Sequence, residues 1–260
     1  MKKQITMIVA IAATCAVFAA GSTKTQDFKN LSEEDKQALF EKRTGGLVRH
    51  EAEGPKIVVV DGRKMPGKVL KYFEQENIEA HGTRPGLPVK TYAEPIESDA
   101  ITAALATLDK EKGAMAIIIY NGGAKAPGVT ACPEDRVGAI NADRYYNKEF
   151  LLLKEVWRII GFIGGVGYSQ YSSDPMQLVF STEDLQEVEG TALLPMSLNA
   201  LKKFNTKFGI KPAYSMPYIA ACRQGWAPQP TNDIQRAIWD KVHQIPDKPI
   251  TIEYDPKIDK

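Results

Sequence analysis

Ala114-Met115-Ala116-Ile117-Ile118-Ile119-Tyr120, followed by Asn121-Gly122-Gly123, is the stretch that decides the fold class. Seven apolar or aromatic residues in a row, bounded by glycines, have the length of a buried strand rather than of a helix. The run Ile57-Val58-Val59-Val60, ended by Asp61-Gly62, has the same character. Strands without polar alternation are typical of sheets that are covered on both faces. The two runs therefore predict an α/β protein.

Helical patterns separate these strands. One helix is expected from Pro66, with Val69, Leu70 and Phe73 on its apolar face, and another after Ser98, which we expect to be its N-cap. Weaker strand signals occur at 89–92 and 137–142. An order of alternating strands and helices predicts a largely parallel sheet. We expect a mixed, twisted sheet flanked by helices.

The N-terminus has the pattern of a signal peptide. Lys2 and Lys3 precede an apolar run over 5–20, which ends in the small residues 19–21. The run is short for a membrane span, although a retained anchor is the alternative reading. Because no later stretch is long and apolar enough, we expect no membrane span after cleavage at about residue 21. The chain is therefore predicted to be secreted or periplasmic.

The net charge bears on nucleic-acid binding, and the cysteine content bears on a possible disulfide. Removing Lys2 and Lys3 from 33 basic residues leaves 31 against 32 acidic residues, a net charge of −1. A near-neutral, interspersed surface has no broad electrostatic footprint for nucleic acid, so no nucleic-acid partner is expected. Cleavage would remove Cys15 and leave Cys132 and Cys222. In an oxidising compartment these two could form one disulfide or stay separate buried thiols.

Four segments are expected along the chain. Residues 1–21 form the signal peptide, and 22–55 an N-terminal arm with one helix capped by Ser32 and a polar linker after it. Residues 56–190 form the α/β core. Residues 191–260 form a helical segment packed on that core, with helices at 196–208, 216–224 and 233–243. Thr231 or Asn232 is expected to cap the last of these.

A long apolar helix over 150–163 carries the most specific pattern. It reads Lys-Glu-Val-Trp-Arg-Ile-Ile-Gly-Phe-Ile-Gly-Gly-Val-Gly-Tyr over 154–168, and Met176 follows eight residues later. This resembles the active-site helix and Met-turn of metzincin zinc peptidases, most closely the archaemetzincin branch, whose pattern is H-E-x-G-H-x-x-G-x-x-H. Gly161 and Gly165 fall on the two glycines of the pattern. The resemblance covers about residues 56–190 and implies a metzincin-like core.

The departures from that pattern bear on function. In this register the three histidine positions are Arg158, Phe162 and Tyr168, and the general-base position is Ile159. A catalytic zinc needs three protein ligands with nitrogen, oxygen or sulfur donors. Phenylalanine has no such donor, and a protonated guanidinium does not bind a cation. We therefore expect neither zinc nor another cofactor, and the inherited peptidase mechanism is not expected either.

Two main readings of the function follow, beside a third in which the chain is a purely structural envelope component, as the polar N-terminal arm suggests. In the first, the chain is a zinc-free pseudo-peptidase that binds an extracellular or periplasmic peptide, protein or glycan in the former substrate cleft, with its binding residues at Arg158, Phe162, Tyr168, Met176 and Trp226. In the second, it is a secreted hydrolase that works through carboxylates, for which Asp61, Asp135 and Asp174 are the candidates. The plainest alternative is that 150–168 is only a buried helix ended by glycines.

Overall fold

The computed structural model describes residues 31–79 and 85–243, which fall into two compact units. The described part of the larger unit comprises 49–79 and 85–215, and that of the smaller comprises 31–48 and 216–243. Strands β1 (Leu47–His50) and β7 (Tyr214–Pro217) pair with each other, and the boundary between the units falls within both strands. The predicted signal peptide lies outside the described residues.

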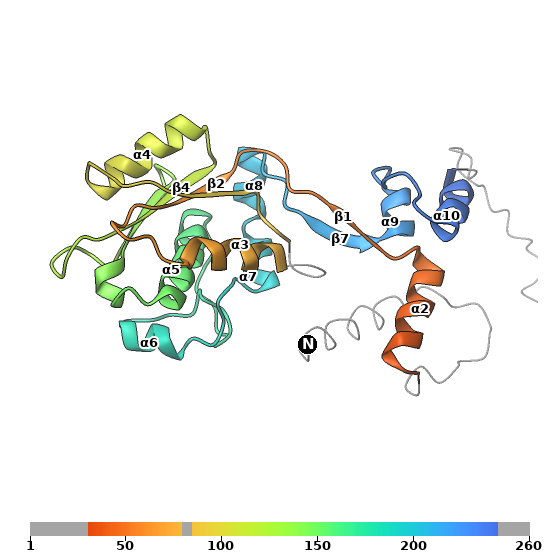
Figure 1. Ribbon diagram of the computed structural model, residues 1–260, viewed down its shortest axis with the longest axis horizontal. Coiled ribbons are helices and arrows are strands. Elements are labelled where there is room, and N and C mark those ends of the chain that lie inside the picture. Colours follow the sequence, from red (N-terminus) through yellow and green to blue (C-terminus); the bar gives the residue numbers. More distant parts are fainter. Residues whose placement is uncertain (1–30, 80–84, 244–260) are drawn as a thin grey trace, which may run out of the picture. The chain divides into compact units, whose positions relative to one another are not determined.

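A five-stranded mixed sheet forms the centre of the larger unit (Figure 1), in the order β3-β2-β4-β6-β5. β2 (Ile57–Asp61), β3 (Val89–Ala93), β4 (Met115–Tyr120) and β6 (Val137–Asn141) are parallel, and β5 (Val129–Cys132) is an antiparallel edge strand. Every residue of β2 and β6 is buried, as is most of β4. The α/β fold class and the mixed sheet predicted from the two apolar runs are confirmed.

Helices cover both faces of this sheet. α4 (Ala100–Glu111) packs Ala104 and Leu108 against one face, where they meet Val58, Val60 and Ile118. α3 (Val69–Glu79) and α5 (Glu149–Ile163) cover the opposite face (Figure 1). The larger of the two hydrophobic clusters lies there, because α5 is apolar over nearly its whole circumference.

The chain after α5 extends that larger cluster. A short 3₁₀ helix, η3 (Ala142–Tyr145), precedes α5, and α6 (Thr182–Glu187), α7 (Pro195–Ala200) and α8 (Lys202–Phe208) follow it. Leu185, Leu193, Leu198 and Leu201 from these segments are buried against the α5 side of the sheet. One predicted helix over 196–208 is thus two helices, with Leu201 between them.

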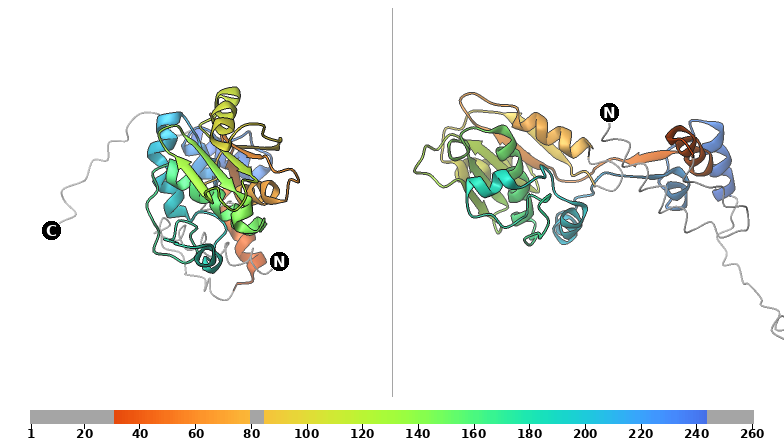
Figure 2. Two further views of the ribbon diagram at one scale, coloured as in Figure 1. Left: turned by 90° about the vertical axis from the view of Figure 1, so that its left-hand side faces the viewer. Right: turned by 90° about the horizontal axis from the view of Figure 1, so that it is seen from below.

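The smaller unit contains α2 (Glu33–Thr44), α9 (Tyr218–Arg223) and α10 (Asp233–His243), each of which appears from two further directions in Figure 2. Ser32 caps α2 as expected, by accepting a hydrogen bond from Asp35 N. Gly45 ends α2 at φ 78°, and the Gln235 side chain donates to its carbonyl from 190 residues away. Residues 216–243 therefore group with the arm at 31–48, whereas the sequence suggested that they pack on the core.

Several local expectations change in the structure. Asp99, not Ser98, caps α4, because its Oδ1 accepts from Ile101 N and Thr102 N. Asn232 rather than Thr231 accepts from Gln235 N at the start of α10. The polar linker expected after Val48 begins as strand β1.

The structure also bears on the possible disulfide and on membrane spans. Cys132 and Cys222 are free thiols in the structure, so the disulfide that the sequence allowed is not formed there. Burial raises the pKa of the Cys222 thiol, which lies beside the Tyr218 hydroxyl. No helix within 31–79 or 85–243 is long and apolar enough to cross a membrane.

Candidate functional site

Helix α5 positions the candidate site. Of its fifteen residues, twelve are buried, and three of those twelve are charged: Lys154, Glu155 and Arg158. Buried charge is rare and needs partners. Lys154 Nζ donates to the carbonyls of Leu185 and Val188 at the end of α6, where a cation is favourable. Lys154 therefore anchors α6, while Glu155 and Arg158 are directed elsewhere.

Arg158 ties α5 to the turn that contains Met176. Its Nη1 donates to the carbonyls of Pro175 at 2.7 Å and Gln177 at 2.8 Å, one on each side of the buried Met176. Its Nε donates to Glu155 Oε2 at 3.2 Å. The guanidinium lies 5.3 Å from the centre of the Phe162 ring, within cation–π range. One side chain thus holds the helix, the turn and the neighbouring ring together.

Glu155 is the buried acid of this group. Its Oε1 accepts a hydrogen bond from the Tyr145 hydroxyl at 3.3 Å. Burial raises the pKa of the Glu155 carboxyl, and the charge of Arg158 with the Tyr145 hydrogen bond only partly offsets that effect. Burial, together with the adjacent Glu155 charge, also raises the pKa of Tyr145. The three side chains form a continuous polar chain inside an apolar layer.

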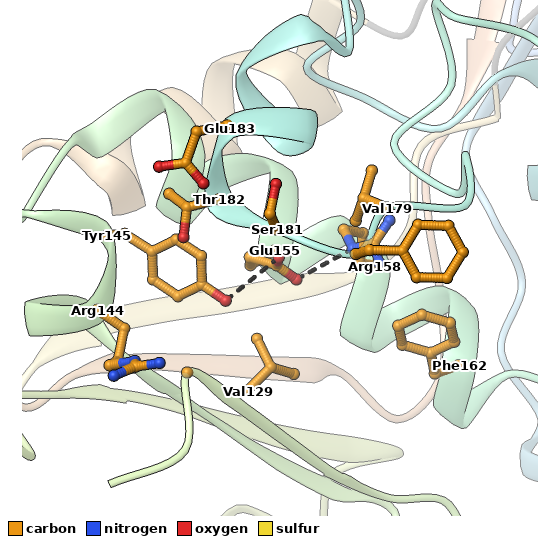
Figure 3. A pocket seen from close by; sticks show the side chains of 12 residues that line it. Val129, Arg144, Tyr145, Glu155, Arg158, Phe162, Val179, Ser181, Thr182 and Glu183 are labelled. Carbon is orange, nitrogen blue, oxygen red and sulfur yellow. Dashed lines mark hydrogen bonds and ion pairs between the residues drawn. The ribbon is translucent and has the colours of Figure 1, made fainter. Parts of the chain in front are cut away.

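This polar chain lies in the wall of a pocket of about 490 Å³ (Figure 3). One wall is the start of the edge strand β5, one is η3, and the floor is α5. The segment just before and at the start of α6 closes the remaining side. The pocket is lined by Gly128, Val129, Arg144, Tyr145, Glu155, Arg158, Phe162, Val179, Phe180, Ser181, Thr182 and Glu183. It combines hydrogen-bonding groups with an apolar surface.

Zinc, which the resemblance implies, does not fit these residues. Arg158 Nη1 and Nε already donate to two carbonyls and a carboxylate, so the guanidinium is a donor group and not a ligand. Phe162 presents a ring, and Ile159 is fully buried. Tyr168 alone offers an oxygen, whereas a catalytic site needs three ligands. Among the described residues, no group of three or more His, Cys, Asp or Glu could hold a metal.

The five predicted binding residues separate in the structure. Arg158 and Phe162 line the pocket. Tyr168 makes an edge-to-face contact with Phe162 at 6.1 Å and is 63% exposed, but it does not line the pocket. Met176 is fully buried next to Gly161 of α5 and does not line the pocket. Trp226 belongs to the smaller unit, where its indole N–H donates to Gln224, and it does not line the pocket.

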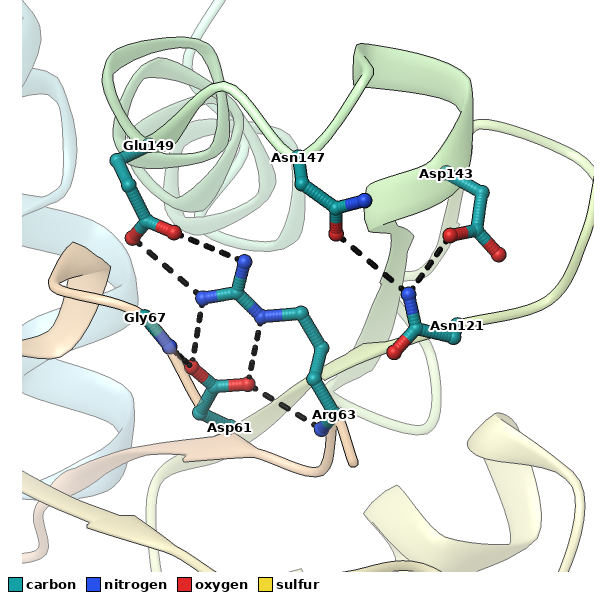
Figure 4. A network of polar contacts seen from close by, with 7 residues as sticks. All are labelled: Asp61, Arg63, Gly67, Asn121, Asp143, Asn147 and Glu149. Carbon is teal, nitrogen blue, oxygen red and sulfur yellow. Dashed lines mark hydrogen bonds and ion pairs between the residues drawn. The ribbon is translucent and has the colours of Figure 1, made fainter. Parts of the chain in front are cut away.

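Asp61 has a structural role at the end of β2 (Figure 4). Both of its oxygens bind the Arg63 guanidinium, at 2.9 and 2.7 Å, and Gly67 N donates to Oδ2. Arg63 also pairs with Glu149 at 2.9 Å, the first residue of α5. Burial alone would lower the pKa of Arg63, but the hydrogen bonds and charges of the two acids raise it. Asp61 therefore links β2 to α5.

The other two carboxylates do not join Asp61. Asp135 is exposed in the hairpin turn between β5 and β6. Ala116 of β4 pairs with both Val58 and Val137, so the turn before Val137 lies near the start of the parallel strands. Asp61 lies at their other end, about 10 Å or more away along the strand direction. Asp174 is buried and accepts from Met176 N and from Ser197 Oγ. The carboxylate pair needed for a shared proton is therefore not assembled from these residues.

Some pocket residues were not predicted as site residues. Glu155, Tyr145 and Arg144 come from α5 and η3, and Phe180 and Glu183 from the segment around the start of α6. The available signal was the pair Glu155 and Arg158, three residues apart on one face of a helix that is mostly apolar. Tyr145 and Phe180 carry no such signal, because only the folded chain brings them to α5.

Two solved structures are similar to this chain. Archaemetzincin from Methanopyrus kandleri is 15% identical at a TM-score of 0.43, over 59% of this chain and 96% of that chain. A zinc-dependent peptidase from Methanocorpusculum labreanum is 12% identical at a TM-score of 0.43, over 56% of this chain and 99% of that chain. No family model matches the sequence, and no curated protein matches it significantly. Membership of the metzincin family stays a prediction at this level of likeness.

Proposed function

We propose that this chain is a secreted or periplasmic protein that binds an extended peptide segment, free or within a protein, in the pocket beside β5, without zinc. The observation that carries the proposal is the pocket itself, which borders the edge strand of the sheet. An extended peptide needs hydrogen-bonding groups for its main chain and apolar surface for its side chains. The pocket offers both, and its floor is held by Arg158 where the resemblance places a metal ligand.

The edge position of β5 supports a peptide in particular. β5 pairs only with β6 among the described strands, so its other edge offers main-chain groups to an added strand. Phe180 projects beside the pocket and is 85% exposed, which is unusual for a large aromatic side chain. Exposed apolar groups next to a concave polar surface are typical of binding sites.

A peptide library tests the proposal with the mature protein, residues 22–260. Binding would be measured by fluorescence polarisation with and without a chelator, and each peptide would be checked for cleavage by mass spectrometry. Phe180→Ser removes an exposed pocket residue, and we expect at least fivefold weaker binding. Leu178→Ser is the matched control, because Leu178 is 48% exposed on the same segment but does not line the pocket. It should change the affinity less than twofold.

Other results would change the proposal in defined ways. Equal loss in both variants would remove the pocket as the binding site. Chelator-sensitive cleavage would restore a zinc peptidase, and cleavage that survives the chelator would favour the carboxylate hydrolase. Binding only on a glycan array run in parallel would replace the peptide by a sugar. The N-terminus of the protein recovered from the producing cells, determined by mass spectrometry, tests cleavage near residue 21.

A further inference from the structure

The guanidinium nitrogens of Arg158 differ in the hydrogen bonds that they donate. Nε and Nη1 donate to Glu155 and to two backbone carbonyls. Nη2 makes no hydrogen bond to any residue within 31–79 or 85–243, although the side chain is only 7% exposed and lines the pocket. Nη2 is not one of the buried polar atoms that lack a partner, so it reaches the solvent of the pocket, where an acceptor of a ligand could replace water. The pocket therefore contains one donor that the protein itself does not satisfy.

The charge around this donor favours an anionic acceptor. Among the described residues only Glu155 forms an ion pair with the guanidinium, and it does so through Nε, so none of these carboxylates contacts Nη2. Arg144 is a second guanidinium in the lining, and Figure 3 shows it on the other side of Tyr145 and Glu155 from Arg158. Glu183 is the one further acid in the lining. A neutral acceptor would make a weaker hydrogen bond to Nη2 than a carboxylate would.

We propose that Arg158 Nη2 binds a carboxylate of the ligand, either an acidic side chain or the C-terminal carboxylate of a peptide. This inference rests on the proposed function, because it names the group by which the pocket recognises a peptide. A carboxylate oxygen beside Nη2 would make a charge-assisted hydrogen bond, which is stronger than one between neutral groups. The Phe162 ring and the two carbonyls hold the guanidinium in place, so little side-chain freedom is lost on binding.

The test uses small probes and needs no peptide hit. N-acetyl-glutamic acid α-amide carries a side-chain carboxylate, N-acetyl-alanine a terminal carboxylate, and N-acetyl-alaninamide neither. Each would be titrated at constant ionic strength into the mature protein while the Arg158 Nε–Hε signal is followed by NMR. At least one acid should shift this signal in a saturable way, with an affinity at least tenfold above that of the amide. The acid that binds more tightly identifies the source of the carboxylate.

Two variants make the result specific to the guanidinium. Arg158→Lys keeps the charge but loses the free Nη2, and should weaken acid binding at least tenfold, as reported by backbone amide signals of α5. Arg136→Lys is the matched control, because Arg136 Nη1 also donates to two carbonyls, of Gly113 and Ala114, but Arg136 does not line the pocket. It should bind the acids as the wild type does. If Arg158→Lys proves unfolded by circular dichroism, the wild-type titration alone decides.

The proposal is overturned if the amide binds as tightly as the acids, if no probe moves the Arg158 signal, or if both lysine variants respond alike. These outcomes are separate from those of the peptide library. Peptides that bind through Phe180 without preferring a carboxylate would leave the proposed function intact and remove this inference. Acids that bind at Arg158 in a protein that retains no peptide would do the reverse.

Discussion

Replacing Gly161 by alanine tests the contact between α5 and the turn at Met176. Gly161 lies inside α5, and a Cβ atom built on it would overlap the Sδ and Cε atoms of Met176. Met176 is fully buried and its turn is held by Arg158, so the thioether has little space to move away. The Gly161–Met176 contact therefore fixes how closely α5 approaches this turn.

Two effects of opposite sign set the magnitude. Overpacking a well-filled core costs about 1–3 kcal/mol. Alanine is favoured over glycine in a helix interior by about 1 kcal/mol. We therefore expect Gly161→Ala to destabilise the larger unit by about 1 kcal/mol, or a Tm lower by about 2–4 °C. In a Met176→Ala background the overlap is gone, and the same change should stabilise by about 1 kcal/mol.

The assay is urea unfolding of the four proteins in this double-mutant cycle, with hydrogen exchange of the α5 amides measured alongside. Hydrogen exchange is needed because the smaller unit could unfold separately and obscure the transition. Alanine at 161 that stabilises both backgrounds would show that the helix and turn are not in close contact. Equal destabilisation in both would place the strain elsewhere than at Met176.

Two further predictions concern the buried carboxylates. Burial raises the pKa of Glu155, so the folded protein holds its proton more tightly than the unfolded chain does. The stability that this proton contributes is present below about pH 4 and is lost as the pH rises above that value. Glu155→Gln should flatten this decline in a series of urea unfolding measurements at rising pH, and an unchanged slope would contradict the burial. Asp61→Asn removes a charged partner of the buried Arg63 and should lower the free energy of unfolding by about 3–5 kcal/mol. Asp135→Asn, in an exposed turn, should lower it by under about 0.5 kcal/mol. A folded Asp61→Asn protein of normal stability would refute the structural role.

The strands and helices of the larger unit could be predicted from the sequence because their signals are local. The β-branched run at 57–60 became β2, the apolar run at 114–120 became β4, and the long apolar run became α5. Glycines and capping residues determine most of the helix ends. The predicted cap at Ser98 was wrong by one residue, since serine and aspartate both suit the position and only the backbone geometry distinguishes them.

The grouping of the arm with the C-terminal helices could not be predicted in the same way. The arm at 31–48 and the segment 216–243 are separated by the whole larger unit in sequence. Their association depends on contacts such as that between Gln235 and Gly45, which are 190 residues apart. A polar amide near a helix end has many possible partners, so its sequence position does not identify this one.

For the charged residues too, some properties follow from the sequence and others only from the tertiary structure. The sequence by itself determined the α/β class, the position of α5 and the absence of a zinc ligand set at 158, 162 and 168, because these depend on local apolar patterns and on the chemistry of single side chains. Only the tertiary structure decided that Arg63 joins Asp61 to Glu149, which lies 86 residues after Arg63 in the sequence. Only the tertiary structure decided that Arg158 holds the turn at Met176 while one of its nitrogens has no partner among the described residues. The physical reason is that a buried charge is defined by the groups that surround it, and those groups come from segments that meet only on folding.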